Sequence, residues 1–244
     1  MPTIRPRPRG WNNDVLRLAA DMRSVIKGPA PLNEAGASVV FEEYQAAAAH
    51  LKERLGRYCS YCERTIPVGL AVEHKLPKEH HPQLELEWHN FLLACANCNS
   101  SKGRAYIPFG SVVWPDEHDT FAFLAYFPSG AIRPRADLDD GVAARVIATL
   151  ALLGLSKAPE QMTSADHRHF DRLEVWRRAE QSKTDLLARD SSELRRAIVE
   201  TARASGGYSI WQAVFNADRA MQRDLANAFP GTNAPHLLVS IEVQ

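Results

Sequence analysis

The chain has 244 residues, a length that suits one sizeable domain or a small domain with an extension. Hydrophobic residues make up 45% and charged residues 24% of the sequence, which excludes a disordered or fibrous protein. The 29 basic and 29 acidic residues cancel, so the formal net charge is zero. Proteins that bind nucleic acid unaided usually carry a basic excess, and this composition therefore argues against tight, unassisted binding.

The N-terminal segment is basic but has no apolar core of the kind that marks a secretory signal. The longest apolar run, from Val146 to Leu155, is about half of the ~20 residues that a membrane-spanning helix requires. We therefore expect a cytoplasmic protein without a membrane segment. The side chains of Arg5, Arg7 and Arg9 could follow a phosphate backbone, but an untethered tail is the default expectation for such a sequence.

Changes in periodicity and in the density of proline and glycine divide the chain into four segments. The first is a tail with a helical lead-in, the second holds the cysteines, and the third is a connector containing a hairpin. The fourth is a helical region for which partner docking is the expected role. Their predicted bounds are 1–58, 59–103, 104–136 and 137–244.

Local patterns predict individual elements within these segments. Apolar spacing predicts helices near residues 13–26 and 38–55, separated by a stretch rich in glycine and proline. Residues 120–127 and 131–132 flank a Ser-Gly pair and predict a β-hairpin. In the C-terminal segment, residues 168–178 alternate basic and acidic groups, which is typical of a solvated helix face.

All four cysteines lie in two Cys-x2-Cys pairs. Cys59 and Cys62 form the first pair, and Cys95 and Cys98 form the second after 32 intervening residues. Two residues between cysteines let a tight turn point both sulfurs at one ion, and two such turns supply the tetrahedron of thiolates that structural zinc prefers. A zinc ion held by all four would have no open coordination position, so its role would be to hold the fold.

The cysteines could instead form disulfides or a redox pair, or be four unrelated buried thiols. In a reducing compartment, however, paired cysteines are metal ligands before they are disulfides. Structural zinc binding is worth about 10–16 kcal/mol in small peptides, enough to hold together a segment of about 45 residues with a thin core. We therefore predict structural zinc.

The residues beside the cysteine pairs predict a compact ββα unit. The stretches 68–74 and 91–94 have the composition of two short strands, and a helix can begin at Asn99, directly after the second cysteine pair. In that arrangement Glu73 and His74, at a strand end, face Asn99 at the helix start across one small site.

These motifs resemble the HNH nuclease family, in the four-cysteine form whose zinc knuckles bracket a ββα-metal core. The similarity runs from Tyr58 to Gly103 and rests on the stretches RYCSYCERTIP, VEHKLPK and EWHNFLLACANCNSSKG. Within the family, the segment looks most like the nuclease subunits of Septu-type antiphage defence systems. The resemblance implies an α+β fold, in which a small zinc-stapled ββα-metal core is embedded in a mainly α-helical chain.

By resemblance, Glu73 occupies the position of the carboxylate that binds the catalytic cation, and His74 the position of the general base. Asn90 takes the position whose side chain braces the loop and orients the base, and Asn99 the position whose side-chain oxygen completes the metal site. This sequence has Asn99 where many members have histidine, and Glu73 where aspartate is frequent. Lys102, one turn after Asn99, is expected to contact a substrate phosphate.

The residue types suit phosphodiester hydrolysis. Carboxylate and amide oxygens are hard ligands suited to Mg²⁺ or Mn²⁺, and such a cation stabilises the charge that develops on the leaving oxygen. Histidine titrates near neutral pH, so His74 suits the removal of a proton from the attacking water.

Each of these residues also has a structural interpretation. A lone His74 would more often be a surface or core histidine, and Asn90 and Asn99 could be turn or cap residues, where asparagine is favoured. The roles of three more histidines are left open, because each could contact a phosphate or lie in a plain solvated position: His80, His81 and His89.

The sequence therefore predicts a metal-dependent HNH endonuclease that cleaves nucleic acid, with DNA favoured over RNA as substrate. The Septu resemblance implies an ATPase partner and a role in antiphage defence, and the zero net charge fits a nuclease that depends on its partner for delivery. Two alternatives stay open. One is an RNA- or tRNA-cleaving toxic effector with the same site, and the other is a non-catalytic zinc-knuckle module that binds nucleic acid or protein.

Overall fold

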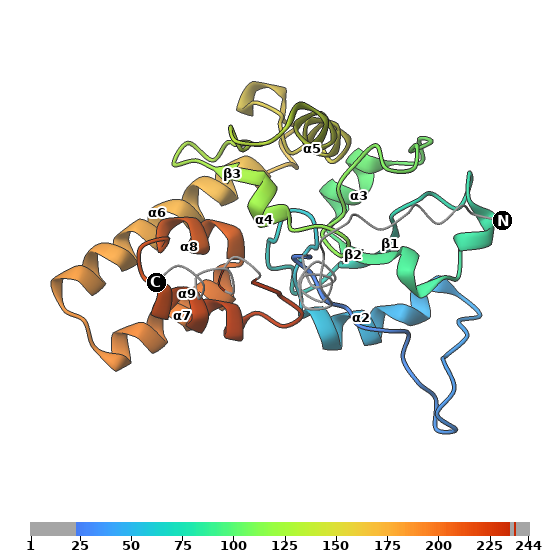
Figure 1. Ribbon diagram of the computed structural model, residues 1–244, viewed down its shortest axis with the longest axis horizontal. Coiled ribbons are helices and arrows are strands. Elements are labelled where there is room, and N and C mark those ends of the chain that lie inside the picture. Colours follow the sequence, from blue (N-terminus) through green and yellow to red (C-terminus); the bar gives the residue numbers. More distant parts are fainter. Residues whose placement is uncertain (1–22, 235–236, 238–244) are drawn as a thin grey trace, which may run out of the picture.

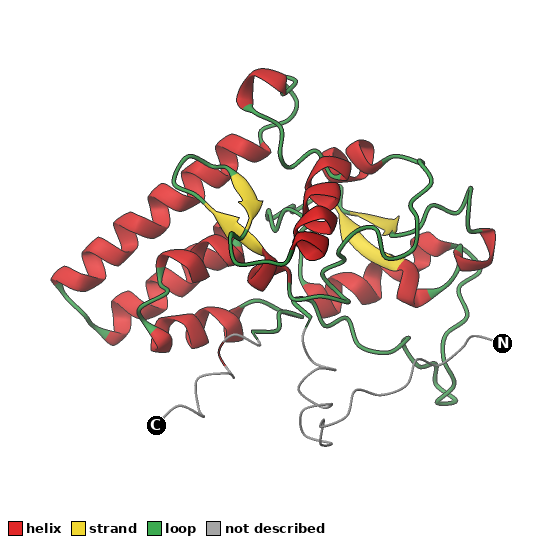
Figure 2. Cartoon of the chain, turned by 45° about the horizontal axis from the view of Figure 1, so that its top comes forward, coloured by secondary structure: helices red, strands yellow, loops and turns green. Residues whose placement is uncertain are grey.

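The computed structural model of the chain describes residues 23–234 and residue 237. These residues form helices around two small antiparallel sheets, as the predicted α+β class requires (Figures 1 and 2). Figure 1 shows β1 and β2 towards one end of the molecule and the long helices α6 and α7 at the other, with α5 and β3 between them. No described helix is both long enough and apolar enough to cross a membrane.

The elements have the following bounds. The α-helices are α2 (Ala47–Leu55), α3 (Ala96–Lys102), α4 (Thr120–Phe123), α5 (Asp140–Leu152), α6 (Arg168–Ala188), α7 (Ser192–Ser205), α8 (Tyr208–Val214) and α9 (Arg219–Ala228). The strands are β1 (Ala71–His74), β2 (Phe91–Ala94), β3 (Leu124–Tyr126) and β4 (Ile132–Pro134). Short 3-10 turns are η1 (Tyr44–Ala46), η2 (Pro82–Leu84), η3 (Trp88–Asn90) and η4 (Pro159–Gln161).

Strands β1 and β2 pair as an antiparallel hairpin and, with α3, form the predicted ββα unit. In the register of the hairpin, His74 lies opposite Phe91 and Glu73 lies opposite Leu92. All four residues of β2 are buried, which explains why its sequence is an unbroken apolar run and does not alternate with polar residues. The unit is therefore anchored by β2 in the middle of a hydrophobic core.

Two bounds of this unit differ from the prediction. The first strand is shorter than expected and begins at Ala71. The helix begins at Ala96 rather than at Asn99, because the sulfur of Cys95 accepts a hydrogen bond from the backbone amide of Cys98 and caps the first turn. Asn99 consequently lies inside α3.

The first lead-in helix is not seen where it can be tested. Residues 13–22 of that prediction lie outside the described residues, and residues 23–26 are not helical. Val25 instead forms an antiparallel bridge with Thr232, near the other end of the chain. Tertiary pairing between distant segments has therefore overridden the local apolar spacing in this stretch.

The second lead-in helix, predicted over 38–55, is shorter than predicted. It starts with a 3-10 turn at Tyr44 and becomes α-helical at Ala47. The preceding residues are held out of the helix, because the amide of Val39 donates to the carbonyl of Pro31.

The predicted hairpin in the connector is confirmed in part. Strands β3 and β4 pair antiparallel, with Tyr126 opposite Ile132. The residues before β3 form the short helix α4 rather than strand, because the carboxylate of Asp119 accepts the amide of Ala122 and caps a helical turn.

Buried apolar side chains form two clusters. The first extends from Phe41 to Leu155 and joins α2, the β1–β2 hairpin, β4 and α5. The second extends from Val175 to Phe229 and belongs to α6–α9, with Trp211 fully buried at its centre. The C-terminal helices therefore have a core of their own, beside the core that contains the cysteines.

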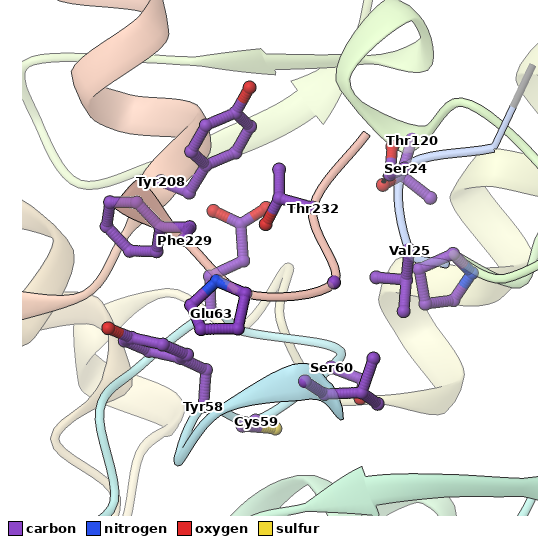
Figure 3. A pocket seen from close by; sticks show the side chains of 14 residues that line it. Ser24, Val25, Tyr58, Cys59, Ser60, Glu63, Thr120, Tyr208, Phe229 and Thr232 are labelled. Atoms are coloured by element: carbon purple, nitrogen blue, oxygen red, sulfur yellow. Dashed lines mark hydrogen bonds between the residues drawn. The ribbon is translucent and has the colours of Figure 1, made fainter. Parts of the chain in front are cut away.

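A small cavity of about 50 Å³ lies where the two clusters meet (Figure 3). There the carboxylate of Glu63 accepts two hydrogen bonds from Ser209, one from the backbone amide at 2.7 Å and one from the side-chain hydroxyl at 2.6 Å. The rings of Tyr58 and Phe229 are 5.1 Å apart, and Figure 3 shows them with Tyr208 on one side of the cavity. The cavity has room for water but not for a nucleotide, so it is a junction and not a substrate site.

Candidate functional site

The four cysteine side chains meet in one cluster, as their spacing predicts. Their Sγ atoms all lie within 4.8 Å of one another, and those of Cys62 and Cys95 are 3.8 Å apart. A tetrahedral zinc ion with Zn–S bonds of about 2.3 Å places its sulfurs about 3.8 Å apart, so the cluster has the dimensions of a structural zinc site. Hydrogen bonds from Cys59, Cys62 and Cys98 hold the pKa of Cys95 below its ordinary value.

The start of α6 borders this cluster, so the predicted solvated face over 168–178 covers only one side of the helix and its other side is buried. The guanidinium of Arg168 donates from Nη1 to the sulfur of Cys98 at 3.2 Å and to the carbonyl of Leu153 at 2.7 Å. Its side chain is only 1% exposed. Burial works to lower the pKa of Arg168, but the hydrogen bond to Asp166 and the neighbouring Cys98 sulfur raise it above its ordinary value.

A second arginine of α6 lies close to the first cysteine pair. Arg172 is 5% exposed, and burial lowers its pKa while the charge of Cys62 opposes that shift. One zinc ion and four thiolates would carry a net charge of about −2. The buried guanidinium groups of Arg168, which also pairs with Asp166, and of Arg172 would offset part of that charge. Arg168, Arg172, Val175 and Ala179 trace one helical stripe, and this spacing was the sequence signal for their burial.

The Glu73 side chain is buried and forms both an ion pair and a hydrogen bond. Its two carboxylate oxygens bind Lys102 Nζ at 2.7 Å and the Tyr61 hydroxyl at 2.8 Å. Burial raises the pKa of Glu73, and the contacts with Lys102 and Tyr61 oppose that rise. The Lys102 side chain is 1% exposed, so its ammonium does not face solvent as a phosphate contact requires. The expected phosphate role of Lys102 is therefore not supported by its position.

His74 directly follows Glu73 and is the last residue of β1. Its Nε2 is 2.8 Å from the backbone carbonyl of Glu85. A carbonyl only accepts, so Nε2 carries the proton and Nδ1 has a free lone pair. The rings of Tyr44 and Phe91 pack edge-on at 4.6 and 5.4 Å, and burial lowers the pKa of His74 below its ordinary value of 6.5. The imidazole is therefore neutral and fixed in orientation at pH 7.

Asn90 braces the loop between the two strands. Its Nδ2 donates to the carbonyls of Leu76 and Leu84 at 3.0 and 3.2 Å, while its Oδ1 accepts the amide of Leu76 at 2.9 Å. The residue is 1% exposed. Because Glu85 directly follows Leu84, this network also positions the carbonyl that holds His74. A direct part of Asn90 in catalysis stays a prediction.

Replacement of Asn90 by alanine is expected to lower the free energy of unfolding by about 2–4 kcal/mol, because three partly buried backbone groups lose their side-chain partner. Chemical denaturation measures this. Asn97→Ala is the matched control, since the Asn97 side chain makes one exposed hydrogen bond to Ala165, and it should cost less than about 1 kcal/mol. Equal losses in both variants would contradict a bracing role.

The other predicted residues occupy varied positions. Asn99 is half-exposed on α3, and its side chain makes no hydrogen bond to a described residue. His80 lies 3.0 Å from the carbonyl of Arg104 through Nε2. His81 is buried, with no described partner for Nε2, whereas His89 is exposed.

The side-chain oxygens of Glu73 and Asn99 are of the type that binds a divalent cation, but in this structure the Glu73 carboxylate is not free to bind one. The carboxylate of Glu73 is already neutralised by Lys102. Among the described residues, the cysteine cluster is the one group of three or more Cys, His, Asp or Glu side chains placed to share an ion. A cation at Glu73 would therefore have to replace the ammonium of Lys102.

Comparison with known families assigns the ββα unit. Residues 59–105 match the family described as HNH endonuclease, which covers both cysteine pairs, the β1–β2 hairpin and α3. This segment is therefore an HNH endonuclease domain, as the motifs indicated.

Part of the chain is also similar to a curated protein. The chain is 39% identical over 56 residues to "Septu protein PtuB" of Bacillus thuringiensis. The aligned stretch covers 22% of this chain and 22% of the relative, so the similarity spans about a fifth of each protein.

Proposed function

We propose that the chain is a metal-dependent endonuclease that hydrolyses phosphodiester bonds in DNA. The observation that carries this is a neutral histidine inside an HNH domain: Nε2 of His74 is fixed on the Glu85 carbonyl, and Nδ1 is free to accept a proton. A general base must hold its lone pair in place and be unprotonated at working pH, and His74 meets both conditions.

In the proposed reaction, His74 Nδ1 takes a proton from the water that attacks phosphorus. The Glu85 carbonyl keeps the imidazole in the required tautomer and stabilises the imidazolium that forms. Asn90 holds the loop that carries this carbonyl, so its contribution is to position the base.

Glu73 and Asn99 are the residues that we propose to hold Mg²⁺ or Mn²⁺. The cation would supply stabilisation of negative charge on the phosphate and the leaving oxygen. Structural zinc is proposed for the four cysteines, whose sulfurs have the required spacing.

The Lys102→Met variant tests the cation site. Loss of the ammonium leaves the Glu73 carboxylate buried and unpaired, which should lower the free energy of unfolding by about 3–5 kcal/mol. Mg²⁺ or Mn²⁺ should then raise the melting temperature of the variant more than that of the parent chain, because the cation no longer competes with Lys102. Lys52→Met, on the exposed face of α2, is the control. No metal-dependent stabilisation of Lys102→Met would remove Glu73 from the cation site.

The pH dependence of cleavage tests the base. Burial lowers the pKa of His74 from 6.5, so the imidazole stays neutral as the pH falls towards that value, and the acidic limb of kcat/KM should lie below pH 6.5. The charge of Lys78 contributes to this shift, so Lys78→Met should move the limb to higher pH. A limb that is unchanged in Lys78→Met would argue that another group is the base.

We further propose that the chain works with an ATPase partner in antiphage defence, on the basis of the Septu relative. The zero net charge supports assisted delivery to nucleic acid. The deciding experiment is a cleavage assay with Mg²⁺ or Mn²⁺ on plasmid, single-stranded DNA and total RNA, with and without the candidate ATPase. Cleavage of RNA alone would favour the toxic effector, and zinc retention with no cleavage of any substrate would favour a binding module.

A further inference from the structure

A second cavity, of about 400 Å³, lies beside the loop that Asn90 braces. It is enclosed by that loop, by the segment 108–118 and by α5, and it is separate from the cysteine cluster. Its volume lies within the range of small-molecule sites in proteins. The residues that give it chemical character are Lys75, His89, Phe109, Trp114, His118 and Arg145.

The guanidinium of Arg145 brings an uncompensated positive charge to this cavity. It donates from Nη2 to His118 Nε2 at 2.7 Å and more weakly to the Val112 carbonyl at 3.4 Å. Because a guanidinium only donates, His118 Nε2 accepts from Arg145. Burial also lowers the pKa of His118, so that imidazole is neutral. No carboxylate of a described residue lies within ion-pair distance of Arg145.

The other charges at the cavity cancel among themselves. Lys75 binds Asp116 at 3.0 Å and also pairs with Glu117, and Lys27 binds Asp116 at 2.8 Å. Two lysines and two carboxylates leave no net charge. The field in the cavity is therefore that of Arg145, which favours an anionic ligand group.

An aromatic surface borders the same cavity. Phe109 lines the cavity and is 71% exposed, and Tyr106 nearby is 59% exposed. His81 links them, with its ring stacked on Tyr106 at 5.9 Å and edge-on to Phe109 at 5.1 Å. Exposed rings held in this way can stack on a nucleobase, because every base presents a π-face.

We propose that this cavity binds one unpaired nucleotide of a nucleic-acid strand, with its base against Phe109 and its phosphate at Arg145. A planar base and an anionic phosphate are the two groups that the exposed ring and the uncompensated guanidinium match. Asn90 lines the cavity and also braces the loop that holds His74, so the strand would continue towards the proposed cleavage site. The inference rests on the proposed nuclease function and adds single-stranded or locally unpaired nucleic acid as its substrate class.

The test measures binding of fluorescent oligonucleotides to the full chain in a His74→Ala background, which keeps the probe intact. Phe109→Ala should weaken binding of a single-stranded deoxyoligonucleotide by about 5- to 100-fold. Arg145→Gln should also weaken it and reduce the slope of log affinity against log salt by about 1. Binding of a blunt duplex of the same sequence should change little in either variant.

Matched controls lie on the exposed part of α6. Phe170→Ala removes a ring that is 51% exposed, and Arg178→Gln removes an exposed guanidinium that pairs with Glu174. Both should leave single-strand binding unchanged. Equal losses in these controls, or no loss in Phe109→Ala and Arg145→Gln with unaltered melting temperatures, would overturn the proposal.

Additional measurements distinguish a nucleic-acid strand from a free mononucleotide as the ligand, and they test the pocket proposal separately from the nuclease proposal. Competition by free dAMP or AMP as strong as that by the oligonucleotide would overturn strand binding in favour of a free mononucleotide. A single-stranded RNA of the same sequence shows whether the sugar matters, and Phe109-dependent binding to either strand supports the pocket.

If the parent chain cleaves nothing but Phe109-dependent binding persists, the nuclease proposal fails and the pocket stands. If the parent chain cleaves and neither pocket variant changes the rate, the pocket proposal fails and the nuclease stands.

Discussion

Replacement of His74 by alanine is expected to slow phosphodiester cleavage by about 10²- to 10⁴-fold, the usual effect of losing a general base. The reason is local and specific. Nδ1 of His74 has a free lone pair, and the structure holds the ring by the Glu85 carbonyl and by the edges of Tyr44 and Phe91.

The alanine variant also loses packing, so a second variant separates chemistry from structure. In His74→Gln the side-chain amide can still donate to the Glu85 carbonyl, but it has no basic nitrogen. It should therefore lose as much activity as His74→Ala while retaining more of the stability. Single-turnover cleavage and thermal melting measure the two effects, with His50→Ala on α2 as the control. Near-parental cleavage by His74→Gln would transfer the base role to another residue.

Removal of metal from the cysteine cluster is expected to unfold the HNH domain. Structural zinc contributes about 10–16 kcal/mol in small peptides, which equals or exceeds the whole stability of many domains, about 5–15 kcal/mol. A strong chelator should abolish the folded signal in near-ultraviolet circular dichroism, and elemental analysis should give one zinc per chain. A chain that stays folded after complete loss of metal would contradict a structural role for zinc.

Arg168 couples this metal site to the C-terminal helices. Arg168→Met removes the hydrogen bond to Cys98 and leaves the thiolate charge uncompensated, so zinc should be lost at lower chelator concentrations than from the parent chain. Arg178→Met, ten residues further along α6 and exposed, should release zinc as the parent does. Equal release from both variants would mean that Arg168 contributes only packing.

Local sequence was sufficient for features that depend on spacing. The two Cys-x2-Cys pairs predicted the cluster, because a short turn can point two sulfurs in only a few directions. The apolar run Phe91–Ala94 predicted a short strand, and this strand pairs with the residues that end in Glu73 and His74. The family assignment followed from these same short-range features.

Features that depend on distant segments were not predictable in this way. Arg168 lies 70 residues from Cys98, and the alternation of charges around it is the same in a solvated helix and in one that covers a metal cluster. Val25 was expected in a helix but pairs with Thr232, a contact that no window of local sequence contains.

The arrangement of the proposed catalytic residues shows the same division. Glu73 and His74 are adjacent in sequence and were expected at one site, but local sequence does not show which partners their side chains contact. In the folded chain, Lys102 and Tyr61 bind the carboxylate of Glu73, and Nε2 of His74 donates to the Glu85 carbonyl. Residue types and spacing identified the HNH segment. The tertiary structure decided which charges are paired, because burial makes an unpaired charge too costly to leave alone.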